Sequence, residues 1–209
     1  MKKTFLLTAL AVAALVSAWA EEGLQIESGG NEVKIIRYVG TSKEVVIPSR
    51  IGGHKVTAIG QESFKGCANV KKITIPEGVT EIEIEAFHSC TALTGISIPE
   101  SVTGIGMWVF EECTALTDIT LPDSIKKIDS GAFTNCTALK KIDLPGSVTE
   151  IGGEAFAGCK NLTGITIPES VRKIGRHAFT GTSLKKVSLP RDCKEDSESF
   201  PKECKVTRY

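Results

Sequence analysis

The side chains best able to do chemistry in this chain are its seven cysteines. Five of them follow one another at intervals of 23 residues: Cys67, Cys90, Cys113, Cys136 and Cys159. A metal site needs ligands that converge on one centre, whereas a fixed period spaces stacked thiols about 4.8 Å apart along a line. That spacing also lies within reach of disulfides between neighbours. We expect these five residues to be buried as small apolar side chains.

The other two cysteines, Cys193 and Cys204, lie off this period in a charged segment near the C-terminus. In an exported chain they would meet an oxidising compartment, where disulfides form and persist. We predict that a disulfide between Cys193 and Cys204 closes this segment and stabilises it by about 2–3 kcal/mol.

The remaining reactive residues do not indicate an active site. His54, His88 and His177 fall in a loop and at two different repeat positions, and no pair has the spacing of metal ligands or of an acid–base pair. No Ser/His/Asp, paired-carboxylate or glycine-rich phosphate motif stands apart from the repeats. We therefore expect no enzyme, no bound metal and no cofactor.

Two surface features favour binding of a partner. The first is a lysine set, in which paired lysines recur in three of six repeats: Lys71, Lys72, Lys140, Lys141, Lys185 and Lys186. Such a row could bind an acidic protein or a sulfated glycan. The alternative, which we favour, is mutual neutralisation by an acidic row just past the prolines: Glu77, Glu100, Asp123 and Glu169.

The second feature is an apolar exception to the repeat. Ile84 and Met107 stand at matching positions of adjacent repeats where the other repeats have polar residues or glycine, and Trp108 follows where most have glutamate. An exposed tryptophan with two apolar neighbours is a candidate contact for a protein partner. The alternative is that the three side chains fold over their own turn.

A tandem repeat must position all of these residues. Prolines and phenylalanines share the 23-residue interval of the cysteines, at Pro76, Pro99, Pro122, Pro145 and Pro168 and at Phe64, Phe87, Phe110, Phe133, Phe156 and Phe179. A period of 20–29 residues with apolar positions predicts a solenoid whose stacked units share one core.

Each unit divides into three parts. Leu116–Leu121 alternates apolar and polar residues and then meets proline, which predicts one strand of a parallel sheet per repeat. Val148–Gly152 should form the opposite wall, with its recurring glycine at positive φ. Glu154–Cys159 should be a single helical or 3₁₀ turn. The six phenylalanines should form a continuous buried spine.

Four segments follow along the chain. Residues 1–20 have a charged start, a short apolar run and an Ala-Trp-Ala cleavage pattern, as a secretory signal peptide does, with cleavage near Ala20. Residues 21–50 should form a strand-hairpin cap, residues 51–190 the repeat array and residues 191–209 a polar C-terminal cap. We expect no membrane-spanning helix, because the apolar run of the leader is too short for one.

The recurring pattern Ile-Pro-x-x-Val-x-x-Ile-Gly-x-x-Ala-Phe-x-x-Cys resembles the BspA-like leucine-rich repeats, also called the Treponema pallidum type. The resemblance covers residues 48–190. It implies a β-rich α/β fold, a right-handed leucine-rich-repeat solenoid of about six 23-residue repeats whose parallel sheet lies on the concave side. It also implies an exported bacterial protein, in a family with members implicated in adhesion to host matrix proteins and to other bacteria.

Together these features predict an exported protein-binding module, secreted, on the cell surface or in the periplasm. The expected partner is a host matrix protein or an envelope component; a structural scaffold of the envelope is the alternative, and a glycan-binding protein or an enzyme is more distant. Without Lys2 and Lys3 the chain has 23 basic and 25 acidic residues. This balance argues against nucleic acid as a partner. We expect a monomer.

Overall fold

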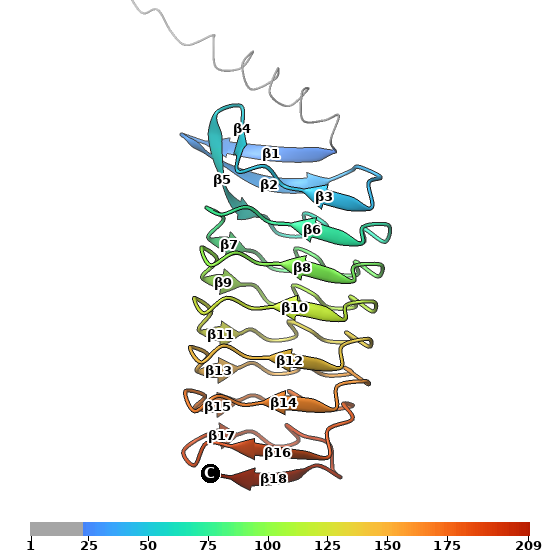
Figure 1. The fold of residues 1–209 in the computed structure, drawn as a ribbon, viewed down its shortest axis with the longest axis vertical. Coiled ribbons are helices and arrows are strands. Elements are labelled where there is room, and N and C mark those ends of the chain that lie inside the picture. Colours follow the sequence, from blue (N-terminus) through green and yellow to red (C-terminus); the bar gives the residue numbers. More distant parts are fainter. Residues whose placement is uncertain (1–22) are drawn as a thin grey trace, which may run out of the picture.

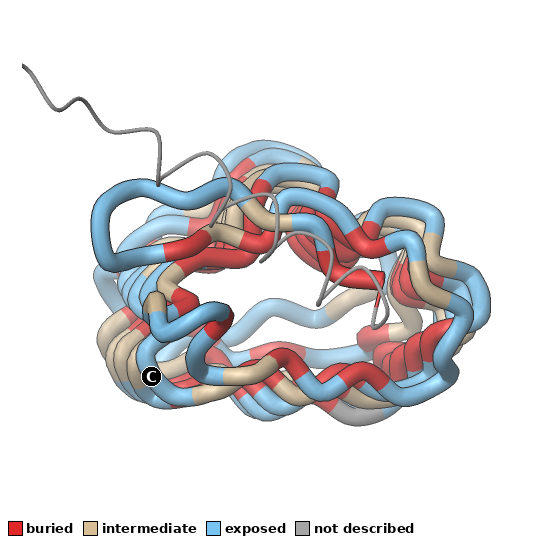
Figure 2. Tube along the Cα trace, turned by 90° about the horizontal axis from the view of Figure 1, so that it is seen from above, coloured by how far each residue is buried: buried red, intermediate tan, exposed pale blue. Residues whose placement is uncertain are grey.

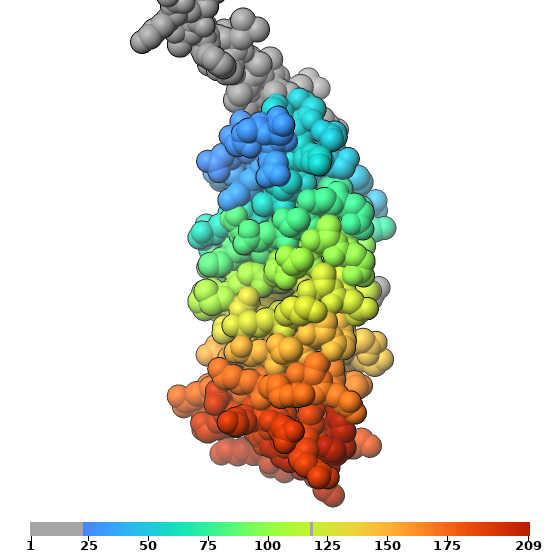
Figure 3. Space-filling view, turned by 90° about the vertical axis from the view of Figure 1, so that its left-hand side faces the viewer, coloured from blue at the N-terminus to red at the C-terminus, as the bar shows by residue number. Residues whose placement is uncertain are grey.

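The strands of this computed structural model lie in two rows that run along a stack of repeats (Figure 1). The structure describes residues 23–209, so the predicted signal peptide lies outside the described residues. In the space-filling view, successive parts of the sequence follow one another along the stack as bands (Figure 3). Each repeat therefore contacts chiefly its two neighbours, as in other solenoids.

We call the first row the proline-side row, because a proline follows most of its strands closely. Its eight strands are β3 (Glu44–Val46), β6 (Lys72–Thr74), β8 (Gly95–Ser97), β10 (Asp118–Thr120), β12 (Lys141–Asp143), β14 (Gly164–Thr166), β16 (Lys186–Leu189) and β18 (Lys205–Arg208). The strands pair in parallel and in register within three groups, β3 to β10, β12 with β14, and β16 with β18. In the first group Ile73 pairs with Ile96 and Ile96 with Ile119. The predicted parallel strand of each repeat is confirmed, but the row consists of three hydrogen-bonded sheets and not of one continuous sheet.

The opposite wall, which the sequence predicts without strands of its own, carries a second set of strands. This glycine-side row consists of β2 (Glu32–Tyr38), β5 (His54–Ile59), β7 (Glu81–Ile82), β9 (Gly104–Ile105), β11 (Lys127–Ile128), β13 (Glu150–Ile151), β15 (Lys173–Ile174) and β17 (Lys194–Glu195). Its strands are also parallel, for example β13 with β15. Each full turn of the solenoid thus contributes two strands instead of one.

The N-terminal end departs from the repeat. β1 (Leu24–Gly29) pairs with β2 in an antiparallel hairpin and extends the glycine-side row outward (Figure 1). The insertion in the first repeat forms a second, smaller hairpin, in which β4 (Arg50–Ile51) pairs with β5. Gly52 and Gly53 form its turn, with φ of 58° and 87°.

The third part of each repeat is a series of hydrogen-bonded turns, where the sequence predicts a single helical or 3₁₀ turn. In the first such segment the Lys65 N–H donates to the Glu62 carbonyl and the Cys67 N–H to the Phe64 carbonyl, over i to i+3 spacings. Other amides of the segment donate to the next repeat instead, as Phe64 does to Ala86. Because these bonds alternate between local and inter-repeat partners, the described residues contain no continuous helix.

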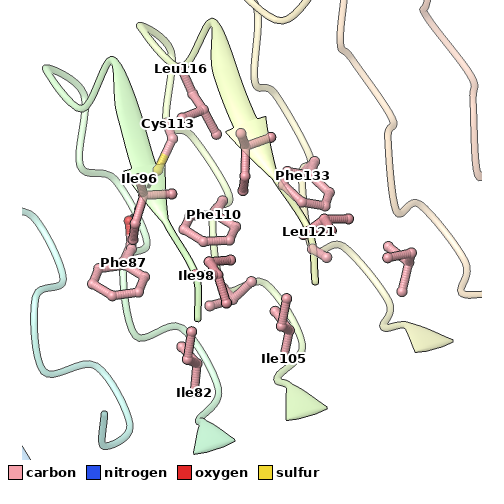
Figure 4. Close-up of a cluster of buried hydrophobic side chains, with 14 of the residues drawn as sticks. Ile82, Phe87, Ile96, Ile98, Ile105, Phe110, Cys113, Leu116, Leu121 and Phe133 are labelled. Carbon is pink, nitrogen blue, oxygen red and sulfur yellow. Dashed lines mark hydrogen bonds between the residues drawn. The ribbon is translucent and has the colours of Figure 1, made fainter. Parts of the chain in front are cut away.

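The phenylalanine spine is confirmed, and it is longer than predicted. All six periodic phenylalanines are fully buried, and neighbouring rings lie 5.2–5.4 Å apart. Tyr38 stacks on Phe64 at one end, and Phe200 stacks on Phe179 at the other. The apolar side chains of successive repeats fill the space between the two rows (Figure 4). Seen along the stack, buried positions line the inside of the ring (Figure 2).

The expected role of the recurring glycine is wrong. Gly60, Gly106, Gly152 and Gly175 do not have positive φ. They are needed for close approach, since a Cβ on Gly152 would lie 2.6 Å from the Ser130 nitrogen in the preceding repeat. Positive φ occurs at two other repeat positions, one of them shared by Glu62, Glu85, Trp108, Gly131, Glu154 and His177.

Candidate partner-binding surfaces

The Trp108 patch, defined as Ile84, Met107 and Trp108, lies where the turn segments leave the glycine-side row. Trp108 has φ of 53°, a conformation that is unfavourable for a bulky residue, and its side chain is 37% exposed. Its backbone N–H donates to the Ser130 carbonyl of the next repeat at 3.0 Å, which fixes this turn against its neighbour. Ile84 and Met107 are partly buried.

The indole of Trp108 packs over the next repeat at Gly131. A Cβ on Gly131 would collide with Cδ1 and Nε1 of the indole, so the ring occupies the space that a side chain there would need. Glycine at residue 131 thus makes room for tryptophan at residue 108. The ring therefore lies against the next repeat on one side, while the residue as a whole remains 37% exposed.

A shallow hollow of about 320 Å³ lies beside this patch. Ile84, Gly104 and Gly106 contribute to its lining, and Glu81, Glu83 and Asp129 add carboxylates. Two of these carboxylates are already paired, Glu83 with Lys34 at 2.5 Å and Asp129 with Lys127 at 3.1 Å. Pairing therefore reduces the negative charge of this hollow, but Glu81 still contributes a carboxylate to its lining.

The six lysines of the lysine set are all exposed, but they do not form one cluster. Lys72 in β6 and Lys141 in β12 are separated by two intervening strands, β8 and β10. Lys141 is paired with Asp143 in its own strand, with 2.9 Å between Nζ and Oδ1. At the C-terminal end Lys186 lies beside Lys205 in the register of β16 and β18. The repeat spacing does not mark Lys205, because this residue lies beyond the regular repeat.

The periodic cysteines form a ladder of buried thiols. The Sγ atoms of Cys90, Cys113, Cys136 and Cys159 each donate to the carbonyl of the phenylalanine of the preceding repeat, at 3.0–3.2 Å. Burial raises the pKa of the Cys113 and Cys159 thiols to about 12 and holds the pKa of Cys136 well above its ordinary value. Cys67 differs, because it begins the ladder at its N-terminal end and is partly exposed.

The ladder thiols should therefore resist alkylation in the folded protein. Iodoacetamide at pH 8 is expected to modify Cys67 and to leave Cys113, Cys136 and Cys159 unmodified, because burial both excludes the reagent and disfavours the reactive thiolate. Peptide mass spectrometry with and without urea measures this difference. Modification of Cys113 or Cys159 in the native state as fast as that of Cys67 would contradict the buried ladder.

Cys193 and Cys204 are free thiols in this structure, Cys193 buried and Cys204 partly buried. Burial raises the pKa of both thiols. A disulfide between them remains a prediction. Intact mass of the exported protein after alkylation tests it, and two modified thiols in this segment would contradict it.

No other site chemistry is evident in the described part of the chain. Within residues 23–209, no group of three or more histidine, cysteine or acidic side chains is placed to hold a metal ion. Over the same residues, no helix has the length and apolar character needed to cross a bilayer.

Comparison with known proteins places the chain in a family. The pattern of the BspA type leucine-rich repeat region matches residues 42–137 and 80–207 and accounts for six copies. The chain belongs to the BspA-type leucine-rich-repeat family. No curated protein matches it.

Solved structures resemble this BspA-type chain over most of its length. A leucine-rich cell surface protein from Faecalibacterium prausnitzii is 32% identical, with a TM-score of 0.79, over 89% of this chain and 53% of that one. The T. pallidum leucine-rich repeat protein is 29% identical, with a TM-score of 0.74, over 89% and 84%. A leucine-rich repeat protein from Eubacterium ventriosum is 28% identical, with a TM-score of 0.72, over 84% and 47%. The BspA-type chain thus spans about half the length of the first and third of these proteins.

Proposed function

We propose that this chain is an exported module that binds another protein through the Trp108 patch. The observation that carries the proposal is the exposed indole of Trp108, held over Gly131 at a turn position where three other repeats have glutamate. A tryptophan ordered before binding loses little conformational freedom when a partner covers it. Tryptophan is also among the residues that most often dominate protein interfaces.

The setting of the patch indicates what kind of partner fits. The hollow beside Ile84 has glycines in its lining, and most of its carboxylates are paired. A matching partner would place an apolar side chain in the hollow. It would also cover the indole of Trp108 with a flat apolar surface. The described residues that surround the patch give no strong electrostatic preference.

The relatives and the predicted leader support a place of action outside the cytoplasm. The F. prausnitzii protein is described as a cell surface protein. With a signal peptide at residues 1–20, this chain would also be exported, and its partner would be a matrix protein of a host or a component of the envelope. Secreted, surface-attached and periplasmic locations all suit such a module.

The test is a pull-down from matrix and envelope extracts with Trp108→Glu beside the wild type. Glutamate occupies the same left-handed position in other repeats, so this variant should keep the fold. We expect a saturable partner whose affinity falls by about 30-fold or more, as for the loss of an interface hot spot of about 2 kcal/mol. An unchanged partner would refute the Trp108 patch as the binding surface.

The lysine set provides a second candidate surface for an acidic protein or a sulfated glycan, because Lys186 and Lys205 lie side by side at the C-terminal end. The double variant Lys186→Glu/Lys205→Glu changes this pair of lysines and serves as the control in the same pull-down. A partner lost with this variant and kept with Trp108→Glu would assign binding to the lysine set. If both variants keep all partners, the scaffold function becomes the one to test.

A further inference from the structure

The N-terminal end of the proline-side row has a free strand edge. β3 pairs with β6 on one side only. Toward β6 the Lys43 carbonyl accepts from the Lys71 N–H at 2.7 Å, and the Ile47 N–H donates to the Thr74 carbonyl at 3.0 Å. Because backbone groups alternate in direction along a strand, the N–H and C=O groups of Val46 point to the opposite side.

This edge faces a recess. β1 and β2 extend the glycine-side row beyond the turn that contains β3 and β5, whereas the proline-side row stops at β3 (Figure 1). A cavity of about 550 Å³ occupies the step. Its lining includes Leu24, Tyr38, Gly40, Thr41, Val45 and Val46. Tyr38 is the last ring of the aromatic stack at this end, so the recess reaches the end of the hydrophobic core.

Three of the six exposed large hydrophobic residues among the described ones lie at this end. Among the described residues, Val46 is the most exposed large hydrophobic side chain, at 67%, and Ile36 and Val39 of the neighbouring strand and its exit are also exposed. A natural edge strand is usually covered or carries charged residues against unwanted pairing. β3 has one such charge, Glu44, and Ser42 Oγ donates to the Glu44 carbonyl at 2.9 Å. The backbone groups of Val46 have no comparable cover in the described structure.

We propose that this recess binds an extended segment of a partner protein, which adds a strand to β3. The inference shares with the proposed function only the premise that the partner is a protein, and it uses a different surface. The array itself indicates the chemistry of the segment. On its covered side Glu44 pairs in register with Lys72 and Val45 with Ile73. A segment in the same register on the open side places a basic residue beside Glu44 and an apolar residue beside Val45, over the cavity.

The ends of the two strand rows favour a single extended segment as the occupant of the recess, and they disfavour the C-terminal end of a second copy. At that end the proline-side row extends past the glycine-side row by one strand, β18. At the N-terminal end the glycine-side row extends past β5 by two strands, β2 and β1. A second copy docked with β18 against β3 would bring its β17 onto the place of β1. An isolated strand meets no such obstruction.

The test uses a fluorescein-labelled peptide with the sequence of residues 71–77, KKITIPE, which is the segment that already covers the other edge of β3. Fluorescence anisotropy with the exported, processed protein should show saturable binding. Val46→Pro removes the N–H that faces the recess and should weaken binding at least tenfold, because that N–H is not part of the ladder with β6. Val206→Pro in β18 is the matched control and should leave binding unchanged.

A charge exchange tests the register. Replacing the second lysine of the peptide by glutamate should weaken binding several-fold, and Glu44→Lys should restore it for that peptide alone. The proposal is overturned if the peptide does not bind saturably, or if Val46→Pro binds it as well as the wild type. Sedimentation showing a dimer that Val46→Pro dissociates would assign the recess to a second copy and would also overturn it. Trp108→Glu should leave peptide binding unchanged, so failure of the proposed function is distinguishable from failure here.

Discussion

Replacing Phe133 by alanine is expected to lower the free energy of unfolding by about 3–5 kcal/mol. Phe133 is fully buried in the middle of the stack, with its ring 5.4 Å from that of Phe110 and 5.2 Å from that of Phe156. Removing the ring loses the free energy gained by burying it. It also leaves a cavity between two repeats, and this cavity cannot close unless both repeats move. Urea denaturation followed by circular dichroism gives the difference.

Phe200→Ala is the matched control for this substitution. Phe200 lies at the end of the aromatic stack, is partly exposed and has Phe179 as its stacked neighbour. Replacing Phe200 by alanine should therefore lower the free energy of unfolding clearly less than replacing Phe133 does. A loss below about 1 kcal/mol for Phe133→Ala would mean that the spine does not hold neighbouring repeats together.

Replacing Gly152 by alanine is expected to destabilise the array by about 1–3 kcal/mol, as overpacking does in other cores. The added Cβ would lie 2.6 Å from the Ser130 nitrogen and 2.8 Å from the Asp129 carbonyl carbon. Both are backbone atoms, so one methyl group must separate two adjacent repeats. The same denaturation experiment measures the effect.

Gly146→Ala tests whether close approach is the cause. No atom lies within 4 Å of a Cβ built on Gly146. This variant should be neutral or slightly stabilising, because alanine restricts the unfolded chain more than glycine does. Equal losses for the two variants would show that glycine itself, and not the space around Gly152, is what the array requires.

Most of the fold could be predicted from the regular spacing of the repeat. A period shared by proline, phenylalanine and cysteine predicts a stack, and the apolar positions within each unit predict which side chains face inward. The spine from Phe64 to Phe179 follows from this spacing alone. Tyr38 and Phe200 could not be recognised in this way, because insertions and deletions at the two ends place them 26 residues before Phe64 and 21 residues after Phe179.

The glycine prediction failed for a physical reason. A recurring glycine indicates either a backbone conformation that needs positive φ or a place where a Cβ has no room, and spacing does not distinguish them. Deciding for Gly152 requires knowing that Ser130 of the preceding repeat lies against it. The residues that do have positive φ include Glu62, Glu85 and Glu154, which nothing in their chemistry marks as such.

The candidate surfaces were predictable only in part. Trp108 stands out in the sequence because it interrupts the glutamates at its repeat position. Glycine at the matching position of the next repeat, residue 131, is a second signal of the contact between them. The contact between them depends on which atoms the stacking brings together. The recess beside β3 could not be predicted from the sequence, because it arises from the unequal lengths of the two strand rows and not from any motif.

The fluorescence of Trp108 tests the proposed function most directly. The chain has two tryptophans, and the other, Trp19, lies in the predicted leader, so the processed protein should contain Trp108 alone. The recovered partner is titrated against the wild type, with Trp108→Phe as the blank. Binding through the Trp108 patch predicts a saturable blue shift and protection from acrylamide quenching. Saturable binding that leaves both signals unchanged would contradict it.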